Sequence, residues 1–226
     1  MRNKALKILF GLSLLPFCAG FTWQMGSTIG TAAFKPLFIY YFLGGGLTYL
    51  TLHLLFRKPV LTYVFGHELT HAFFAVLFGG SVKSFHASNR GGRVTITKSN
   101  FLITLAPYFF PLYTFIVILV YWMANAAEVH GAAPWLTFLT GATFTFHLVL
   151  TFVFLQADQD DIREQGAVFS YPLIYLFNVL FASLLVRLIL TEGMDYTKFL
   201  SDGIMKSINM TVLFMSTIAS FVFPSA

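Results

Sequence analysis

Charged residues are scarce in this chain of 226 residues, since Asp, Glu, Lys and Arg together make up only 10% of it. A soluble domain carries roughly 25% charged residues, so this sequence has too few to cover a water-facing surface. Charge is also completely absent from residues 99–127 and 129–157. Each stretch exceeds the roughly 20 apolar residues that a membrane helix requires. These absences exclude a soluble globular protein and predict a polytopic integral membrane protein.

Other absences narrow the class further. The chain has one cysteine, Cys18, so an internal disulfide is excluded. We find no internal repeat, and no interval between apolar segments is long enough for a soluble regulatory domain. The net charge of +5 is better explained by basic loops against anionic lipid headgroups than by nucleic acid. We therefore expect a single domain over residues 1–226 that contacts the lipid bilayer and binds no nucleic acid.

Seven apolar segments are candidate membrane spans. They cover residues 5–21, 36–56, 59–78, 101–123, 135–156, 169–190 and 208–223. The first begins among three basic residues, Arg2, Lys4 and Lys7, like a signal peptide. Its apolar run is long and has no clear small-x-small cleavage site, so we expect an uncleaved anchor at 5–21. The last is only mildly apolar. The expected fold is an all-α polytopic membrane protein with six or seven transmembrane helices, in an orientation that the basic loops leave open.

One loop has a different character from the others. Residues 79–100 read GGSVKSFHASNRGGRVTITKSN, with a Gly-Gly entry and a turn-rich SNRGG centre. The segment RVTIT alternates like a strand, and SVKSFHA is a suitable partner for it. We therefore expect a β-hairpin inserted between two membrane helices. A free edge of this hairpin offers a place where an extended segment can bind by β-addition.

The segment VFGHELTHAFFAVLFGG, residues 64–80, places two histidines and a glutamate inside an apolar run. His67, Glu68 and His71 form the pattern H-E-x-x-H, in which the two imidazoles share one face of a helix. Such a pair can bind one zinc ion, with Glu68 beside it to accept a proton from water. With six His and four Glu in the chain, about 0.003 chance matches are expected. Ionisable groups inside a membrane are costly and functional by default, so we interpret the pattern as a metal site.

A catalytic zinc site needs at least one more protein ligand and an open position for water. His147 and His53 lie within candidate spans, and His147 is also well explained as a buried helix-packing histidine. A cluster of carboxylates, in LQADQDDIREQG, follows the fifth candidate span and could reach back to the depth of His67. The remaining candidates are loop histidines. The full set is His53, His86, His130, His147, Asp158, Asp160 and Asp161.

These residues resemble a known family. An H-E-x-x-H helix, a glycine-led hairpin and a helix opening FLITLAPYFFP are similar to the site-2 protease family of intramembrane zinc metalloproteases, over residues 63–170. The segment QDDIREQG lacks the usual Leu-Asp-Gly of that family and is more similar to an element of its small, divergent bacterial-type members. That similarity selects Asp161, with Asp158 or Asp160 as alternatives.

The resemblance implies an enzyme of a bacterial cell membrane that hydrolyses peptide bonds of membrane-embedded protein or peptide substrates. His67, His71 and Asp161 would bind Zn²⁺, and Glu68 would act as the general base and acid. Two alternatives use the same side chains without proteolysis: a membrane transporter that relays protons or ions, and a zinc-holding scaffold. A transporter should show repeats and broken helices, and the glycine triplet 44–46 is the one candidate break, which close helix packing explains equally well.

Overall fold

A computed structural model describes residues 4–56, 58–129, 131–157 and 159–222 of the chain. The chain forms two compact units, one made of Met1–Phe34 with Gly166–Ala226 and the other of Lys35–Gln165. Helices dominate both units, and the described residues contain one two-stranded sheet. The expected all-α membrane architecture with an inserted hairpin is therefore confirmed.

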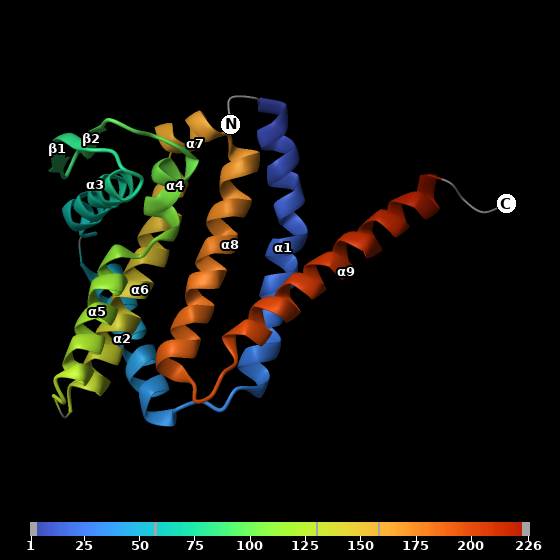
Figure 1. The fold of residues 1–226 in the computed structure, drawn as a ribbon. Helices are drawn as coiled ribbons and strands as arrows, with labels where there is room; N and C mark the ends of the chain where they lie inside the picture. Colours follow the sequence, from blue (N-terminus) through green and yellow to red (C-terminus); the bar gives the residue numbers. More distant parts are fainter. Residues whose placement is uncertain (1–3, 57, 130, 158, 223–226) are drawn as a thin grey trace. The chain divides into compact units, whose positions relative to one another are not determined.

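The larger unit, Lys35–Gln165, contains all the elements around the predicted metal site (Figure 1). In chain order these are α2 (Pro36–Leu55), α3 (Val60–Leu77), β1 (Val82–Ser88), β2 (Gly91–Ile96), α4 (Phe101–Phe109), α5 (Leu112–Ala126), α6 (Ala132–Leu155) and α7 (Asp160–Gln165). Helix α6 packs against α2 and α5, while α3 packs against α4 and both strands. The helix with the H-E-x-x-H pattern is therefore covered by the hairpin on one side and by α4 on another.

Close helix packing explains the glycine triplet in α2. A Cβ atom added at Gly45 would lie 1.9 Å from the backbone oxygen of Phe138 in α6, and one added at Gly141 would lie 1.9 Å from the backbone oxygen of Phe42. Small residues that let two backbones approach in this way are typical of membrane helix pairs. Helix α2 runs unbroken through the triplet, so this segment is a packing element rather than a break.

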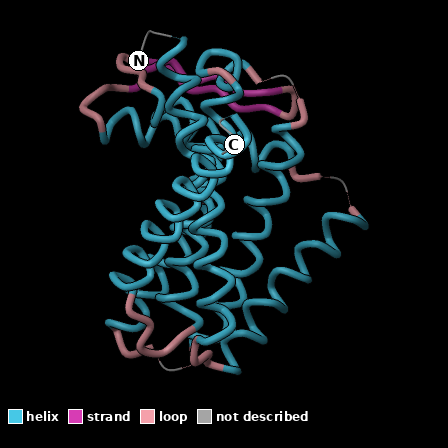
Figure 2. Tube along the Cα trace, turned by 90° about the vertical axis from the view of Figure 1, so that its right-hand side faces the viewer, coloured by secondary structure: helices cyan, strands magenta, loops and turns pink. Residues whose placement is uncertain are grey.

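The hairpin forms as the sequence predicted. Strands β1 and β2 pair antiparallel, from Val82 opposite Ile96 to Ser88 opposite Gly91, and Figure 2 shows them as two adjacent magenta strands. Side-chain hydroxyls also pair across the strands, since Ser84 Oγ donates to Thr95 Oγ1 at 2.8 Å.

The predicted span 101–123 is bent. Helices α4 and α5 meet at an angle of 73° across a break of two residues, Phe110 and Pro111. Proline cannot donate a backbone hydrogen bond and fits the start of a new helix better than the interior of one. Pro107 and Pro111, four residues apart, therefore account for this bend. The hydrophobic pattern alone does not predict it.

Five described helices are long and apolar enough to cross a membrane, and the bent α4–α5 pair makes a sixth if it counts as one span. This agrees with the lower of the two expected numbers. The seventh candidate, at 208–223, overlaps α9 (Tyr196–Val222), which does not meet the same criterion. Its final residue lies outside the described part of the chain.

The smaller unit combines α9 with α1 (Lys4–Thr31), α8 (Ala167–Leu185) and a π-helical turn η1 (Val186–Leu190). Helix α1 packs against both α8 and α9. It includes the expected anchor 5–21 but continues for ten residues beyond it. The core of this unit contains Cys18, Phe21, Leu176 and Phe199.

Candidate metal centre

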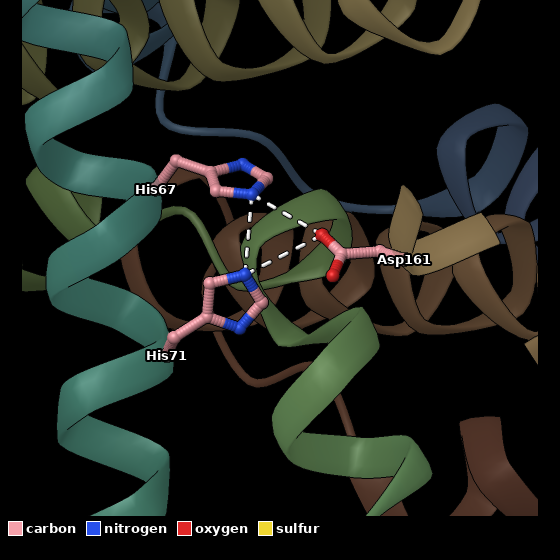
Figure 3. Close-up of side chains that lie close together, drawn as sticks. All are labelled: His67, His71 and Asp161. Carbon is pink, nitrogen blue, oxygen red and sulfur yellow. Dashed lines mark hydrogen bonds and ion pairs between the residues drawn. The ribbon is translucent and has the colours of Figure 1, made fainter. Parts of the chain in front are cut away.

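Helix α3 presents the two histidines of the H-E-x-x-H pattern on one face. His67 and His71 are four residues apart, so their rings lie one above the other and the two Nε2 atoms face each other at 3.2 Å (Figure 3). Both side chains are nearly buried. The local sequence thus produces the paired imidazoles through helix geometry alone.

A carboxylate from a distant part of the chain completes the cluster. Asp161, in the first turn of α7, places its Oδ2 atom 3.4 Å from His67 Nε2 and 3.4 Å from His71 Nε2 (Figure 3). These three residues are the group among the described residues whose donor atoms lie close enough together to hold one metal ion. The carboxylate cluster that follows the fifth candidate span thus includes a short helix, from which Asp161 reaches His67 as expected.

The spacing of these three donor atoms fits zinc. Ligand atoms about 2.0–2.1 Å from a zinc ion at the corners of a tetrahedron lie about 3.3–3.4 Å from one another. The three observed separations are 3.2, 3.4 and 3.4 Å. Two imidazoles and one carboxylate are also a donor set that zinc uses in catalytic sites, where the fourth position stays open. The chain therefore has the geometry and the chemistry for such an ion.

A backbone carbonyl freed by a proline orients His71. The Nδ1 atom of His71 donates to the Ile103 carbonyl oxygen at 2.8 Å. In a regular helix that oxygen would accept from the backbone N–H four residues later, but position 107 in α4 is Pro107, which has no N–H. The hydrogen bond fixes Nδ1 as the protonated nitrogen and leaves Nε2 with the lone pair that a metal requires.

Asp161 is held by a tyrosine of α4. The Tyr108 hydroxyl donates to Asp161 Oδ2 at 3.1 Å. Burial raises the pKa of the Asp161 carboxyl, but when protons rather than a metal ion occupy the Nε2 atoms of His67 and His71, their hydrogen bonds and charge outweigh this effect and hold the pKa well below its usual range. The carboxylate is therefore ionised at neutral pH, as a metal ligand must be.

His67 differs from His71 in its second nitrogen. Its Nδ1 atom is buried and has no hydrogen-bond partner among the described residues. Aromatic rings surround it instead, with Tyr108 at 5.1 Å and Tyr63 at 5.9 Å between ring centroids. Packing rather than hydrogen bonding thus orients this imidazole.

Glu68 lies beside the two histidines under the hairpin. A cavity of about 340 Å³ is lined by Glu68, the three clustered residues, β2 and α7. The contact with β2 is close, because a Cβ atom added at Gly92 would lie 2.5 Å from Glu68 Cγ. Glycine at position 92 is therefore what lets the strand approach the glutamate. The carboxylate has access to a polar cavity although the side chain is only 8% exposed.

The other candidate ligands that the structure describes do not belong to this metal-ligating group. Asp160 is exposed and pairs with Arg163, and His53 contacts Tyr49 at 3.2 Å. His86 belongs to the exposed strand β1. His147 is buried and shares a small cavity with His67 but is not in the metal-ligating group. Asp158 and His130 lie outside the described residues.

Sequence reasoning did not identify three contributors to this site. They are the Tyr108 hydroxyl, the Ile103 carbonyl and Gly92. Pro107 was a usable signal for the second of these, since a proline beyond the first turn of a helix frees the carbonyl four residues earlier. Nothing in the sequence around Tyr108 or Gly92 indicates which distant side chain each one meets.

Comparison with known proteins places this geometry in a family. The model of the family described as "Peptidase M50B-like" matches residues 40–159, which is 120 of the 226 residues and just over half of the chain. No curated protein and no solved structure matches. The match covers His67, Glu68 and His71 but ends two residues before Asp161, so the position of Asp161 rests on the geometry above. Together with the apolar helices, the match identifies a multi-pass integral membrane protein, and the chain belongs to the Peptidase M50B-like family, as its resemblance to site-2 proteases predicted.

Proposed function

We propose that this protein is an intramembrane zinc metalloprotease that hydrolyses peptide bonds of membrane-embedded substrates. The observation that carries the proposal is the tetrahedral spacing of the His67, His71 and Asp161 donor atoms, two of them on the membrane-type helix α3 and one on the short helix α7, with Glu68 next to them. Family membership supports the protease class. The assignment of these four residues rests on the H-E-x-x-H pattern, on the family resemblance and on their geometry.

In this proposal, His67, His71 and Asp161 bind the metal, and Glu68 acts as the general base and acid. Bound zinc supplies Lewis acidity, which polarises a carbonyl group and makes water a better nucleophile near neutral pH. Glu68 accepts the proton of the attacking water and passes it to the departing amine. The polar cavity beside Glu68 supplies the water that hydrocarbon cannot.

The hairpin is proposed to receive the unwound substrate. A helical substrate must open locally, because its carbonyls are hydrogen-bonded within the helix. Each strand of a two-stranded sheet has one edge without a ladder partner, and residues 92–94 of β2 line the cavity beside Glu68. We expect Gly92→Ala to impair cleavage by pushing β2 away from Glu68, whereas Gly44→Ala, whose added Cβ meets nothing closer than 3.8 Å, should not. Equal cleavage by both variants would contradict this role for the strand.

Purified protein tests the function in two steps. Zinc content should be about one ion per chain, should fall in His67→Ala and should persist in Glu68→Gln, since Glu68 is not a ligand. Cells that carry the Glu68→Gln variant should then accumulate membrane proteins that the wild-type protein removes. Glu128→Gln, which changes an exposed glutamate outside the site, is the matched control.

The same experiment separates the alternatives. A proton or ion relay without a metal predicts no zinc in the wild-type protein. A zinc-holding scaffold predicts zinc but the same membrane proteome in Glu68→Gln and wild-type cells. A loss of zinc in Glu68→Gln as complete as in His67→Ala would instead make Glu68 a ligand.

A further inference from the structure

A second cavity lies within the smaller unit, and none of its lining residues belongs to the metal centre. It has a volume of about 470 Å³ and is bounded by the end of α1, the segment after η1 and the first turns of α9. This volume is within the range of about 300–1,000 Å³ found for small-molecule sites. Its lining residues lie outside 40–159, the part matched by the protease family. Family membership therefore gives it no role.

The length of α1 places this cavity at the level of lipid headgroups. The helix has 28 residues, or about 42 Å at about 1.5 Å per residue, and the hydrocarbon core is about 30 Å thick. Counting from Lys4, about 20 residues end at Trp23, which is 63% exposed and suits an aromatic belt at the interface. The cavity-lining residues Gln24 to Thr31 then lie just beyond the hydrocarbon.

The neighbouring chain segments leave the membrane at the same level. The Glu192 N–H donates to the Ala33 carbonyl oxygen at 3.1 Å, which ties the end of the α8–η1 span to the end of α1. Helix α9 starts from this point and crosses α1 closely, because a Cβ atom added at Gly20 would lie 2.2 Å from Ser207 Oγ. The three elements that form the cavity are thus fixed to one another.

The cavity carries charges of both signs. Two lysines and three acidic residues line it: Lys198, Lys206, Glu192, Asp195 and Asp202. Within the described chain, no two of these form an ion pair. Lys206 Nζ donates instead to Ser27 Oγ at 3.0 Å, which holds an ammonium group and a hydroxyl at the same wall. Opposite charges that line one cavity without pairing suit a ligand that carries both signs.

We propose that this cavity binds a phosphoethanolamine group, in which an ammonium is joined to a phosphate, as in the headgroup of phosphatidylethanolamine. The ammonium groups of Lys198 and Lys206 contact the phosphate. The carboxylates of Glu192 and Asp202 contact the ammonium. Trp23, Ile204 and Met205, which are sequence neighbours of the lining residues, have exposed apolar side chains that are available to the acyl chains of such a lipid. This role does not depend on proteolysis.

Lipid titration of the full-length protein in detergent, followed by native mass spectrometry, tests the proposal. Phosphatidylethanolamine should bind at least fivefold more tightly than phosphatidylglycerol, which has the phosphate but no ammonium. Lys206→Gln and Asp202→Asn should each weaken this binding about fivefold, the upper end for one exposed ion pair. Lys206→Arg should retain it, and Lys83→Gln and Glu128→Gln, which lie outside the smaller unit, should bind as wild type.

Free phosphoethanolamine identifies the source of the group. Binding at least tenfold weaker than that of the lipid assigns the ligand to the membrane, and equal binding assigns it to a soluble molecule with the same chemistry. Equal affinity for the two phospholipids, or unchanged affinity in both Lys206→Gln and Asp202→Asn, would overturn the proposal. A loss in Lys206→Arg as large as in Lys206→Gln would also do so, because the positive charge is retained.

Discussion

Replacing Pro107 with alanine should weaken zinc binding without weakening the fold. Alanine restores an N–H that can donate to the Ile103 carbonyl oxygen, the acceptor that His71 Nδ1 now uses at 2.8 Å. Loss of the hydrogen bond that orients a metal-ligating histidine lowers metal affinity about 10–100-fold. A carbonyl oxygen has two lone pairs and can still accept from both donors, so we expect the lower end, about tenfold or about 1.4 kcal/mol.

The expected loss of zinc affinity is not accompanied by a loss of thermal stability, so general unfolding cannot imitate it. Proline in a helix interior is about 3 kcal/mol less favourable than alanine, so the metal-free Pro107→Ala variant should unfold at the same or a higher temperature than wild type. Zinc affinity is measured by competition with a chelator, and the visible spectrum of the cobalt-substituted protein reports the ligand geometry directly. Pro16→Ala, inside α1, is the matched control. Wild-type zinc affinity together with an unchanged cobalt spectrum in Pro107→Ala would refute the reasoning.

The parts of the site that follow from local periodicity could be predicted from the sequence. His67 and His71 share a face because helix geometry repeats about every 3.6 residues, and no tertiary information is needed to pair them. The hairpin also follows from a short segment with strand alternation and a glycine-rich turn. Membrane spans follow from the length of the apolar segments, although that length did not predict the bend between α4 and α5.

Contacts between distant segments could not be obtained in the same way. Composition and spacing left Asp158, Asp160 and Asp161 as alternatives, and only the resemblance to a family favoured one of them. The orientation of a six-residue helix decides which acid faces the histidines, and α7 turns Asp161 inward and leaves Asp160 exposed. The Tyr108 hydroxyl reaches Asp161 across 53 positions of sequence, a pairing that depends on how α4 packs.

Two further predictions concern α7. Asp161→Ala should lower zinc affinity, since a carboxylate ligand is lost, while Asp160→Ala should leave the zinc content of the purified protein unchanged; the reverse ranking would remove Asp161 from the proposed site. The second prediction is that cysteines introduced at Asn89 and Arg163, in a background without the native cysteine, react with a membrane-impermeant thiol reagent from the same membrane face. The reason is that β2 and α7 line one cavity. They should therefore lie on the same membrane face, with two membrane crossings of the chain between them. If α4–α5 is one broken span, α6 supplies the return crossing; if α4–α5 is a re-entrant loop, α6 alone lies between the two sites and they label from opposite faces. Opposite labelling would therefore contradict the six-span topology. It would also contradict the proposal that the Asp161 carboxylate reaches His67 from the membrane face on which the hairpin lies.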